Sequence, residues 1–132
     1  EYGYLQKIKP HPANVVTESV AQAATSMAAN LKAAAIICLT ETGFSARLIS
    51  KYRPACPILA ITSSQIVARK LCMNWGVVPV LYQGELSDLA RIEFAIAEAK
   101  QVAHADGSDT LIVTAGHHQQ AGGTDLIRVI TL

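Results

Sequence analysis

The segment AAIICLTETGFSARLISKYRPACPILAITS, residues 34–63, decides the fold. It begins with an apolar, partly β-branched run over Ala34–Thr40, which is typical of a strand covered on both faces. The next residues predict a helix over Ser45–Tyr52, which Pro54 stops, and Pro57–Ser63 gives a second strand. A strand, a helix and a second strand imply a right-handed crossover between parallel strands.

The same alternation continues on both sides of this segment. Helical spacing predicts a long helix before it, and further helices and strands after it. The predicted elements are a helix over Ala13–Lys32, a helix over Gln65–Asn74 capped by the preceding serine pair, a strand over Gly76–Tyr82, a helix from Ser87 to about Ala105, and strands over Thr110–Gly116 and Leu126–Leu132. Because Pro79 cannot donate to a ladder, its strand is predicted to lie at an edge of the sheet.

The last two strands are joined by a glycine-rich loop of about nine residues, which is too short for a helical crossover. The last strand is therefore predicted to be antiparallel. We expect one domain over residues 1–132: a three-layer α/β/α sandwich with a five-stranded, mostly parallel sheet.

Composition narrows the classes of function. The eleven basic and ten acidic residues give a net charge of +1, so a nucleic-acid partner is not expected. The apolar stretch Val20–Leu39 is interrupted by polar residues, so no membrane span is expected. Cys38, Cys56 and Cys72 are predicted to be buried free thiols of a cytoplasmic protein. The start at Glu1, without an initiator Met, indicates a piece of a longer chain.

The loop after the first strand carries the most informative polar residues. Thr40, Thr42 and Ser45 offer hydroxyl groups, Gly43 lets the backbone approach a ligand, and the following helix directs N–H groups toward an anion. The loop after the fourth strand adds Gly122, Gly123 and Thr124, and the two loops are expected to meet at the carboxyl edge of the sheet. They could form a pocket for a phosphate monoester.

The same residue types also cap helices without any ligand, so the cap and the phosphate site both remain open from these residues alone. The loop lacks the Gly-Lys-Ser/Thr of a Walker A motif and has no G-x-G-x-x-G pattern. ATPase and dinucleotide-binding functions therefore lose support.

Several motifs in order resemble the carboxyl-terminal domain of pyruvate kinase. They are the "LTETGFSA" loop, the "KYRP" after its helix, the "PILAIT" strand, the "WGVVPV" segment, "TLIVTAG" and the terminal "GGTDLIRVITL". The resemblance covers nearly the whole chain. Linked motifs in the same order are more specific than any single one.

The resemblance implies a regulatory domain that binds a sugar phosphate or nucleotide monophosphate and helps to build a tetramer. In that family, catalysis belongs to a separate (β/α)₈ barrel, which transfers phosphate from phosphoenolpyruvate to ADP with Mg²⁺ and K⁺. The barrel has no counterpart in this sequence. We therefore expect this chain to hold no cofactor and to be inactive in isolation, with the rest of a pyruvate kinase chain as its partner.

The resemblance also implies an effector site. Its expected residues are Thr40, Thr42, Gly43, Phe44 and Ser45 in the first loop, Arg91 for a second phosphate, and Gly122, Gly123 and Thr124 in the last loop. Glu41 and Phe44 depart from the family pattern, which usually has a basic or polar residue at these positions. A carboxylate about 4 Å from a phosphate costs on the order of 1–4 kcal/mol. A monophosphate such as ribose 5-phosphate or AMP would suit the loop better than a bisphosphate.

Two other functions remain open. The pocket could be vestigial in a domain that serves only as a subunit contact, or the chain could be a stand-alone enzyme acting on phosphate esters. Adjacent His117 and His118 are not expected to bind a metal. The cluster Lys51-Tyr52-Arg53 is explained by its place at a helix C-terminus, although it could also steer an anion.

Overall fold

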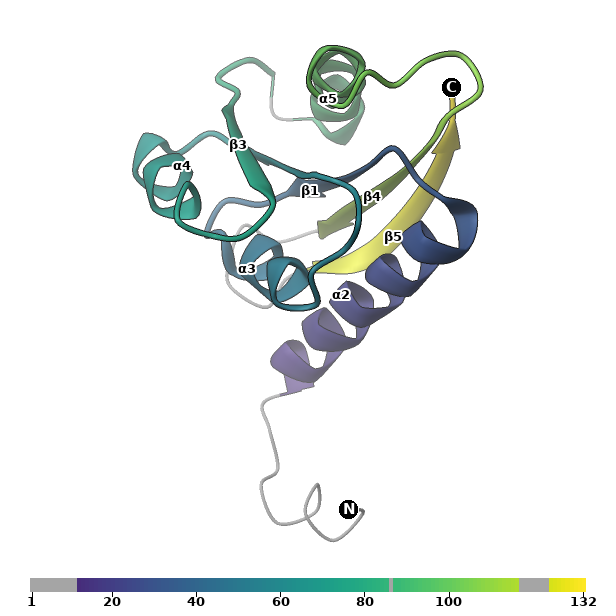
Figure 1. The fold of residues 1–132 in the computed structure, drawn as a ribbon. Helices are drawn as coiled ribbons and strands as arrows, with labels where there is room; N and C mark the ends of the chain where they lie inside the picture. Colours follow the sequence, from purple (N-terminus) through teal and green to yellow (C-terminus); the bar gives the residue numbers. More distant parts are fainter. Residues whose placement is uncertain (1–11, 86, 117–123) are drawn as a thin grey trace, which may run out of the picture.

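Five strands form one sheet in the order β3-β2-β1-β4-β5, with helices on both faces (Figure 1). This computed structural model describes residues 12–85, 87–116 and 124–132. The strands are β1 (Ala35–Leu39), β2 (Ile58–Thr62), β3 (Val77–Leu81), β4 (Thr110–Gly116) and β5 (Thr124–Thr131). The helices are α2 (Pro12–Leu31), α3 (Phe44–Lys51), α4 (Gln65–Leu71) and α5 (Asp88–Val102).

The pairing of the strands confirms the predicted fold. β1 pairs in parallel with both β2 and β4, and β2 pairs in parallel with β3. β5 runs antiparallel to β4, as the short connection predicted, with a register shift at Ala115/Gly116. β3 lies at an edge of the sheet, in agreement with the missing N–H of Pro79.

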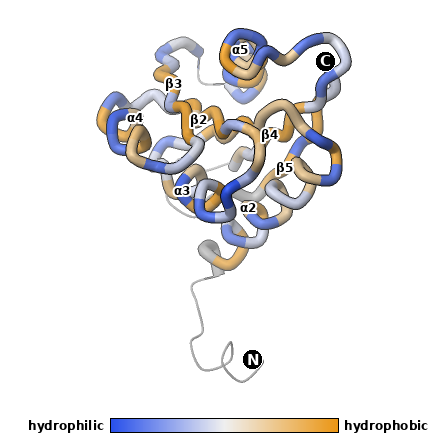
Figure 2. The backbone as a smooth tube through the Cα atoms, viewed as in Figure 1, coloured by the Kyte–Doolittle hydropathy of each residue, from blue (hydrophilic) through white to orange (hydrophobic). Residues whose placement is uncertain are grey.

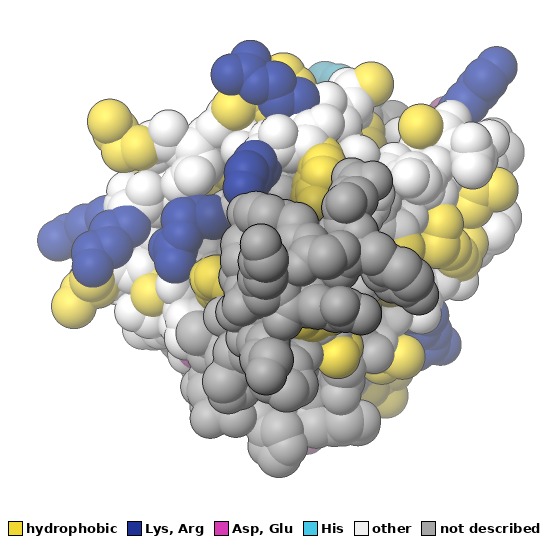
Figure 3. All heavy atoms as spheres, turned by 90° about the horizontal axis from the view of Figure 1, so that it is seen from below, with side chains coloured by type: hydrophobic (Ala, Val, Ile, Leu, Met, Phe, Trp, Pro, Cys, Tyr) yellow, Lys and Arg dark blue, Asp and Glu magenta, His cyan; other side chains and the backbone are white. Residues whose placement is uncertain are grey.

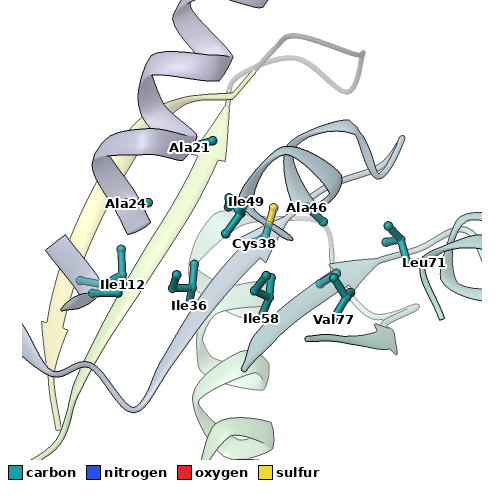
Figure 4. Packing of buried hydrophobic residues seen from close by; sticks show 12 residues of the cluster. Ala21, Ala24, Ile36, Cys38, Ala46, Ile49, Ile58, Leu71, Val77 and Ile112 are labelled. Carbon is teal, nitrogen blue, oxygen red and sulfur yellow. The ribbon is translucent and has the colours of Figure 1, made fainter. Parts of the chain in front are cut away.

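The three central strands are covered on both faces, because alternate side chains point to opposite sides. Ile36 and Cys38 of β1 face α2 and α3, where they pack with Ala24 and Ile49 (Figure 4). This face is lined largely by alanine on the helices and by isoleucine on the strands, so α2 can lie close to the sheet. β1 and β2 are buried along their whole lengths.

The opposite face is covered by α5. Ile37 and Leu39 of β1 pack with Ile92 and Ala95 of this helix. The strands accordingly appear as apolar segments within the sandwich, whereas the helices alternate between polar and apolar residues (Figure 2). None of the helices described by the structure is long and apolar enough to cross a membrane.

Several element ends differ from the predictions. α4 stops at Leu71 rather than Asn74, because residues 72–74 continue as turns toward the left-handed Gly76. α5 ends at Val102 rather than near Ala105, since His104 adopts a left-handed conformation with φ 55°. β5 begins at Thr124, two residues before its predicted start, because pairing with β4 extends to Gly116.

The three cysteines are free thiols as predicted, but the predicted burial is confirmed only for Cys38. Cys38 is buried, Cys56 is half-buried and Cys72 is exposed, and all three are free thiols. Cys72 is exposed because it caps the C-terminal end of α4 at the surface. Burial raises the pKa of the Cys38 thiol to about 11, although hydrogen bonds with Thr114 and Ser45 oppose the shift.

Candidate functional site

The loop after β1 lies at the edge of the sheet where a doubly wound fold places its ligands. β1 and β4 are parallel neighbours. From β1 the chain builds β2 and β3 on one side of it and then returns through α5 to β4 on the other side, so the strand order reverses between β1 and β4. Ligands of such sheets bind beyond the carboxyl ends of the strands at this reversal. The residues 40–43 therefore occupy the expected position.

Gly43 makes the tight turn that joins β1 to α3. It has φ 83°, and its N–H donates to Oγ1 of Thr40 over 2.8 Å. A Cβ atom built on Gly43 would lie 3.2 Å from side-chain atoms of Arg47, Val67 and Leu71. The position requires glycine both for its conformation and for the close approach of α3 and α4.

The hydroxyl groups of the loop bind its own backbone. Oγ1 of Thr42 accepts from the N–H of Phe44 over 3.3 Å, and Gly43 itself makes no side-chain cap. Thr40 and Ser45 are buried, whereas Thr42 is half-buried. The threonine pair therefore caps α3, and because a hydroxyl that accepts a hydrogen bond can still donate one, the same group can also bind an anion.

The carboxylate of Glu41 binds residues of neighbouring elements. Its Oε2 accepts a hydrogen bond from the hydroxyl of Ser63, which follows β2. Its Oε1 lies 3.7 Å from Nη1 of Arg91 on α5. The Glu41 carboxylate thus links β1, β2 and α5 at the edge where a ligand would bind.

Arg91 is held by two carboxylates. Its Nη2 lies 2.7 Å from Oδ1 of Asp88, one turn earlier in α5, while Nη1 faces Glu41. The side chain is 9% exposed, and its Nε has no hydrogen-bond partner within the described part of the chain. The guanidinium expected to bind a second phosphate is therefore already paired with Asp88 and Glu41.

Arg47 is a cation near the loop that the sequence interpretation missed. It lies on the first turn of α3, is exposed, and its Nη1 comes close to the turn at Gly43. No carboxylate among the described residues forms an ion pair with it. The helix dipole favours negative charge in the first turn, so a cation there does not stabilise the helix. The position of Arg47 in the first turn of a predicted helix was therefore the signal from which the sequence could have indicated an anion site.

The structure brings together only part of the predicted site. Thr40, Thr42, Gly43, Phe44 and Ser45 lie in one turn, and Glu41 connects that turn to Arg91. Gly122 and Gly123, like His117 and His118, lie outside the described residues. Thr124 is the first residue of β5 and pairs with Gly116. Among the residues that the structure describes, no group of His, Cys, Asp and Glu could hold a metal ion.

The strand order and the loop after β1 define a doubly wound α/β domain with its reversal point between β1 and β4. The family model described as "Pyruvate kinase, alpha/beta domain" matches residues 18–130. The chain belongs to this family.

Complete enzymes are among its relatives. The pyruvate kinase of Lactococcus lactis is 36% identical over 132 residues, which are 100% of this chain and 26% of that protein. Pyruvate kinase 2 of Synechocystis is 40% identical over 115 residues, or 86% of this chain and 20% of that protein. The pyruvate kinase of Sporosarcina psychrophila is 37% identical over 115 residues, which are 86% of this chain and 20% of that protein. The chain thus spans about a fifth to a quarter of these relatives.

Proposed function

We propose that this chain is the regulatory and oligomerisation domain of a pyruvate kinase, and that its loop over residues 40–45 binds the phosphate of a monophosphate effector. The longer protein would transfer phosphate from phosphoenolpyruvate to ADP in the cytoplasm, with Mg²⁺ and K⁺ in its barrel. The family membership and the names of the relatives support the identity of the longer protein.

The turn at Gly43 is the observation that carries the effector site. It places the hydroxyls of Thr40 and Thr42 at the N-terminus of α3. The partial positive charge of that terminus favours an anion, and the exposed Arg47 guanidinium adds a full positive charge nearby. A phosphate would accept hydrogen bonds from these groups in place of water.

The pairing of Arg91 favours a monophosphate over a bisphosphate. A second phosphate would have to compete with Glu41 and Asp88 for this guanidinium. It would also approach two carboxylates, whose repulsion costs on the order of 1–4 kcal/mol each at about 4 Å. A ligand with one phosphate avoids both penalties.

Calorimetric titration of the chain with ribose 5-phosphate, AMP and fructose bisphosphate tests this proposal. We expect saturable binding of a monophosphate and its loss in Thr42→Ala and Arg47→Gln. Ser64→Ala is the matched control, because Ser64 caps α4 through the N–H of Val67 but lies outside the loop. Equal loss in Ser64→Ala, or no binding of any of the three compounds, would contradict the effector site.

A subunit contact is the second candidate function, and the edge strand β5 favours it. Leu126 and Val129 of this strand are 46% and 42% exposed, although an exposed edge strand usually carries charged residues. In a tetramer, a second copy of the chain could cover them. Sedimentation should then show a dimer for the wild type and a monomer for Val129→Lys, whereas a monomeric wild type would argue against a contact through β5.

A further inference from the structure

A cavity of about 500 Å³ opens at the end of α3 that is distant from the effector loop. It lies between the last turns of α2 and the segment from Tyr52 to Cys56, which connects α3 to β2. The volume falls within the range of small-molecule sites. Its position at the amino-terminal edge of the sheet is unexpected for this fold, which places ligands at the other edge.

Two cations line the cavity in an unusual backbone conformation. Lys32 has φ 51° and Arg53 has φ 49°, and each follows the end of a helix. Hydrogen bonds from Lys32 to Ala29 and from Ala33 to Ala28 form a Schellman motif, in which glycine is the preferred residue. A side chain in this conformation is strained, so both positions carry a cation at the expense of stability.

A third helix end shows that this conformation does not by itself define the cavity. His104 follows α5 with φ 55°, but it does not line the cavity. Among the described residues, Lys32, Arg53 and His104 therefore share the left-handed conformation. Of these three, Lys32 and Arg53 line the cavity. His104 provides an internal control for any experiment on the other two.

The charge of the cavity is positive. No Asp or Glu within the described ranges forms an ion pair with Lys32 or Arg53, and none lines the cavity. The guanidinium of Arg53 also lies over the ring of Trp75, 5.5 Å from its centroid, which orients the side chain. Viewed from the side of α2 and α3, the described surface displays Lys and Arg side chains and very few acidic ones (Figure 3).

Apart from Thr25, Tyr52 and Cys56, the rest of the cavity wall is made of small apolar side chains. Ala28 and Pro54 are buried, and Ala29, Ala33 and Ala55 extend the same surface. Small side chains leave room for the body of a ligand. An apolar wall with a few polar groups at its rim is typical of a site for a small organic molecule.

We infer that this cavity binds a small organic anion, with a carboxylate or phosphate head between Lys32 and Arg53 and a compact apolar body on the alanines and Pro54. Tyr52 also lines the cavity, and its side chain carries a hydroxyl that can donate a hydrogen bond. The site is separate from the effector loop, because the eight residues of α3 span about 12 Å between the two ends of that helix.

Cys56 provides a reporter at the site. It lines the cavity and is half-buried, whereas Cys72 is exposed elsewhere. The chain is treated with iodoacetamide, and alkylation of each cysteine is followed by mass spectrometry of its peptide. Benzoate and phenyl phosphate serve as probes with different heads on one body, benzamide is the neutral counterpart of benzoate, and inorganic phosphate lacks the body.

Both anionic probes should slow the alkylation of Cys56 in a saturable manner and leave Cys72 unchanged. At about four times the Kd the rate should fall about fivefold, because only the free fraction reacts. Benzamide and inorganic phosphate should protect much less. Equal protection by benzamide, or none by either anionic probe, would overturn the proposal.

Glycine variants separate binding from folding. Lys32→Gly and Arg53→Gly remove a cation and relieve the left-handed strain, so these chains should remain folded and lose the protection of Cys56. His104→Gly relieves the same strain outside the cavity and should retain it. Protection that survives in both cavity variants, or disappears equally in His104→Gly, would overturn the proposal.

One further variant distinguishes this site from the effector loop. Thr42→Ala should abolish the binding of a monophosphate effector but leave the protection of Cys56 by benzoate unchanged. Loss of protection in Thr42→Ala would mean that the probes act through the effector loop, which would overturn the cavity site. Loss of effector binding in Thr42→Ala with unchanged protection of Cys56 would support the cavity as a separate site.

Discussion

At the scale of single residues, Glu41 should limit which anions the proposed effector loop can bind. Its carboxylate faces the Arg91 guanidinium and accepts a hydrogen bond from Ser63. The sequence showed Glu41 as an acidic departure within a phosphate-binding pattern. The structure adds that this carboxylate pairs with the buried Arg91. Glu41 therefore both repels a phosphate and occupies a guanidinium that could otherwise bind one.

Replacement of Glu41 should therefore change the preference of the loop. In Glu41→Gln we expect fructose bisphosphate to bind about tenfold more tightly, or about 1.4 kcal/mol, because Arg91 becomes available to a second phosphate. The free energy of unfolding should fall by about 1–2 kcal/mol as the ion pair is lost. Calorimetry and denaturant titration measure the two effects.

The exposed carboxylate of Glu93 on α5 gives the matched control, since Glu93→Gln changes the net charge equally. This variant should alter neither bisphosphate affinity nor stability by a comparable amount. If it tightened the binding of fructose bisphosphate as much as Glu41→Gln, the effect would come from net charge and not from Arg91.

Cys38 predicts a dependence of stability on pH. Burial raises its pKa in the folded chain to about 11, above the ordinary cysteine value of 9.0, so the folded chain retains a proton that the unfolded chain loses. The stabilisation is complete below pH 9 and is lost as the pH rises toward 11, by up to about 2–3 kcal/mol. Denaturant titrations over this range should show the fall, and Cys38→Ala should lack this component of it.

At the scale of elements, sequence patterns predicted the strands well because the central ones are buried on both faces. β1 and β2 differ from their predicted bounds by one residue at each end. α4 was predicted three residues too long, since Cys72, Met73 and Asn74 contain no residue that breaks a helix. The end of α4 at Leu71 follows from tertiary packing, which the spacing of apolar residues does not report.

The candidate site was predictable only where it is local in sequence. The turn of Thr40, Thr42 and Gly43 could be proposed because glycine and hydroxyl residues cluster before a helix. The contact between Glu41 and Arg91 joins β1 to α5, and the sequence gives no signal for so distant a pair. The cavity at Lys32 and Arg53 was missed for the same reason, although Arg53 belonged to a cluster that could steer an anion.

The turn between β1 and α3 should be sensitive to a single methyl group. Gly43→Ala places a Cβ at φ 83° and 3.2 Å from three side chains, so we expect the free energy of unfolding to fall by about 2–4 kcal/mol. Gly76 has φ 70° but no atom within 4 Å of an added Cβ. Gly76→Ala should therefore cost only about 1 kcal/mol in the same denaturant titration.

If the two glycine variants were equally stable, the close packing of α3 and α4 against the turn would not be what requires glycine at position 43. The backbone conformation alone would then explain both positions. The comparison thus separates the steric contribution at Gly43 from the conformational contribution that the two glycines share.

At the scale of the whole molecule, α3 connects the two regions that are proposed to bind anions. Its N-terminus adjoins the proposed effector loop, and its C-terminal end leads through Arg53 to the cavity beside α2. The helix packs against β1 and β2 through Ala46 and Ile49 (Figure 4). An effector could regulate the longer enzyme only by binding one of its states more tightly than the other.

The most direct test of the effector site is the titration of backbone amide resonances of the chain with ribose 5-phosphate. We expect saturable shifts at Thr42, Gly43, Phe44 and Ser45, with an apparent Kd that weakens in Arg47→Gln, and no change at the C-terminal end of α5. Shifts that are absent from these four amides, or that centre on another part of the molecule, would contradict the assignment of this loop as the phosphate site.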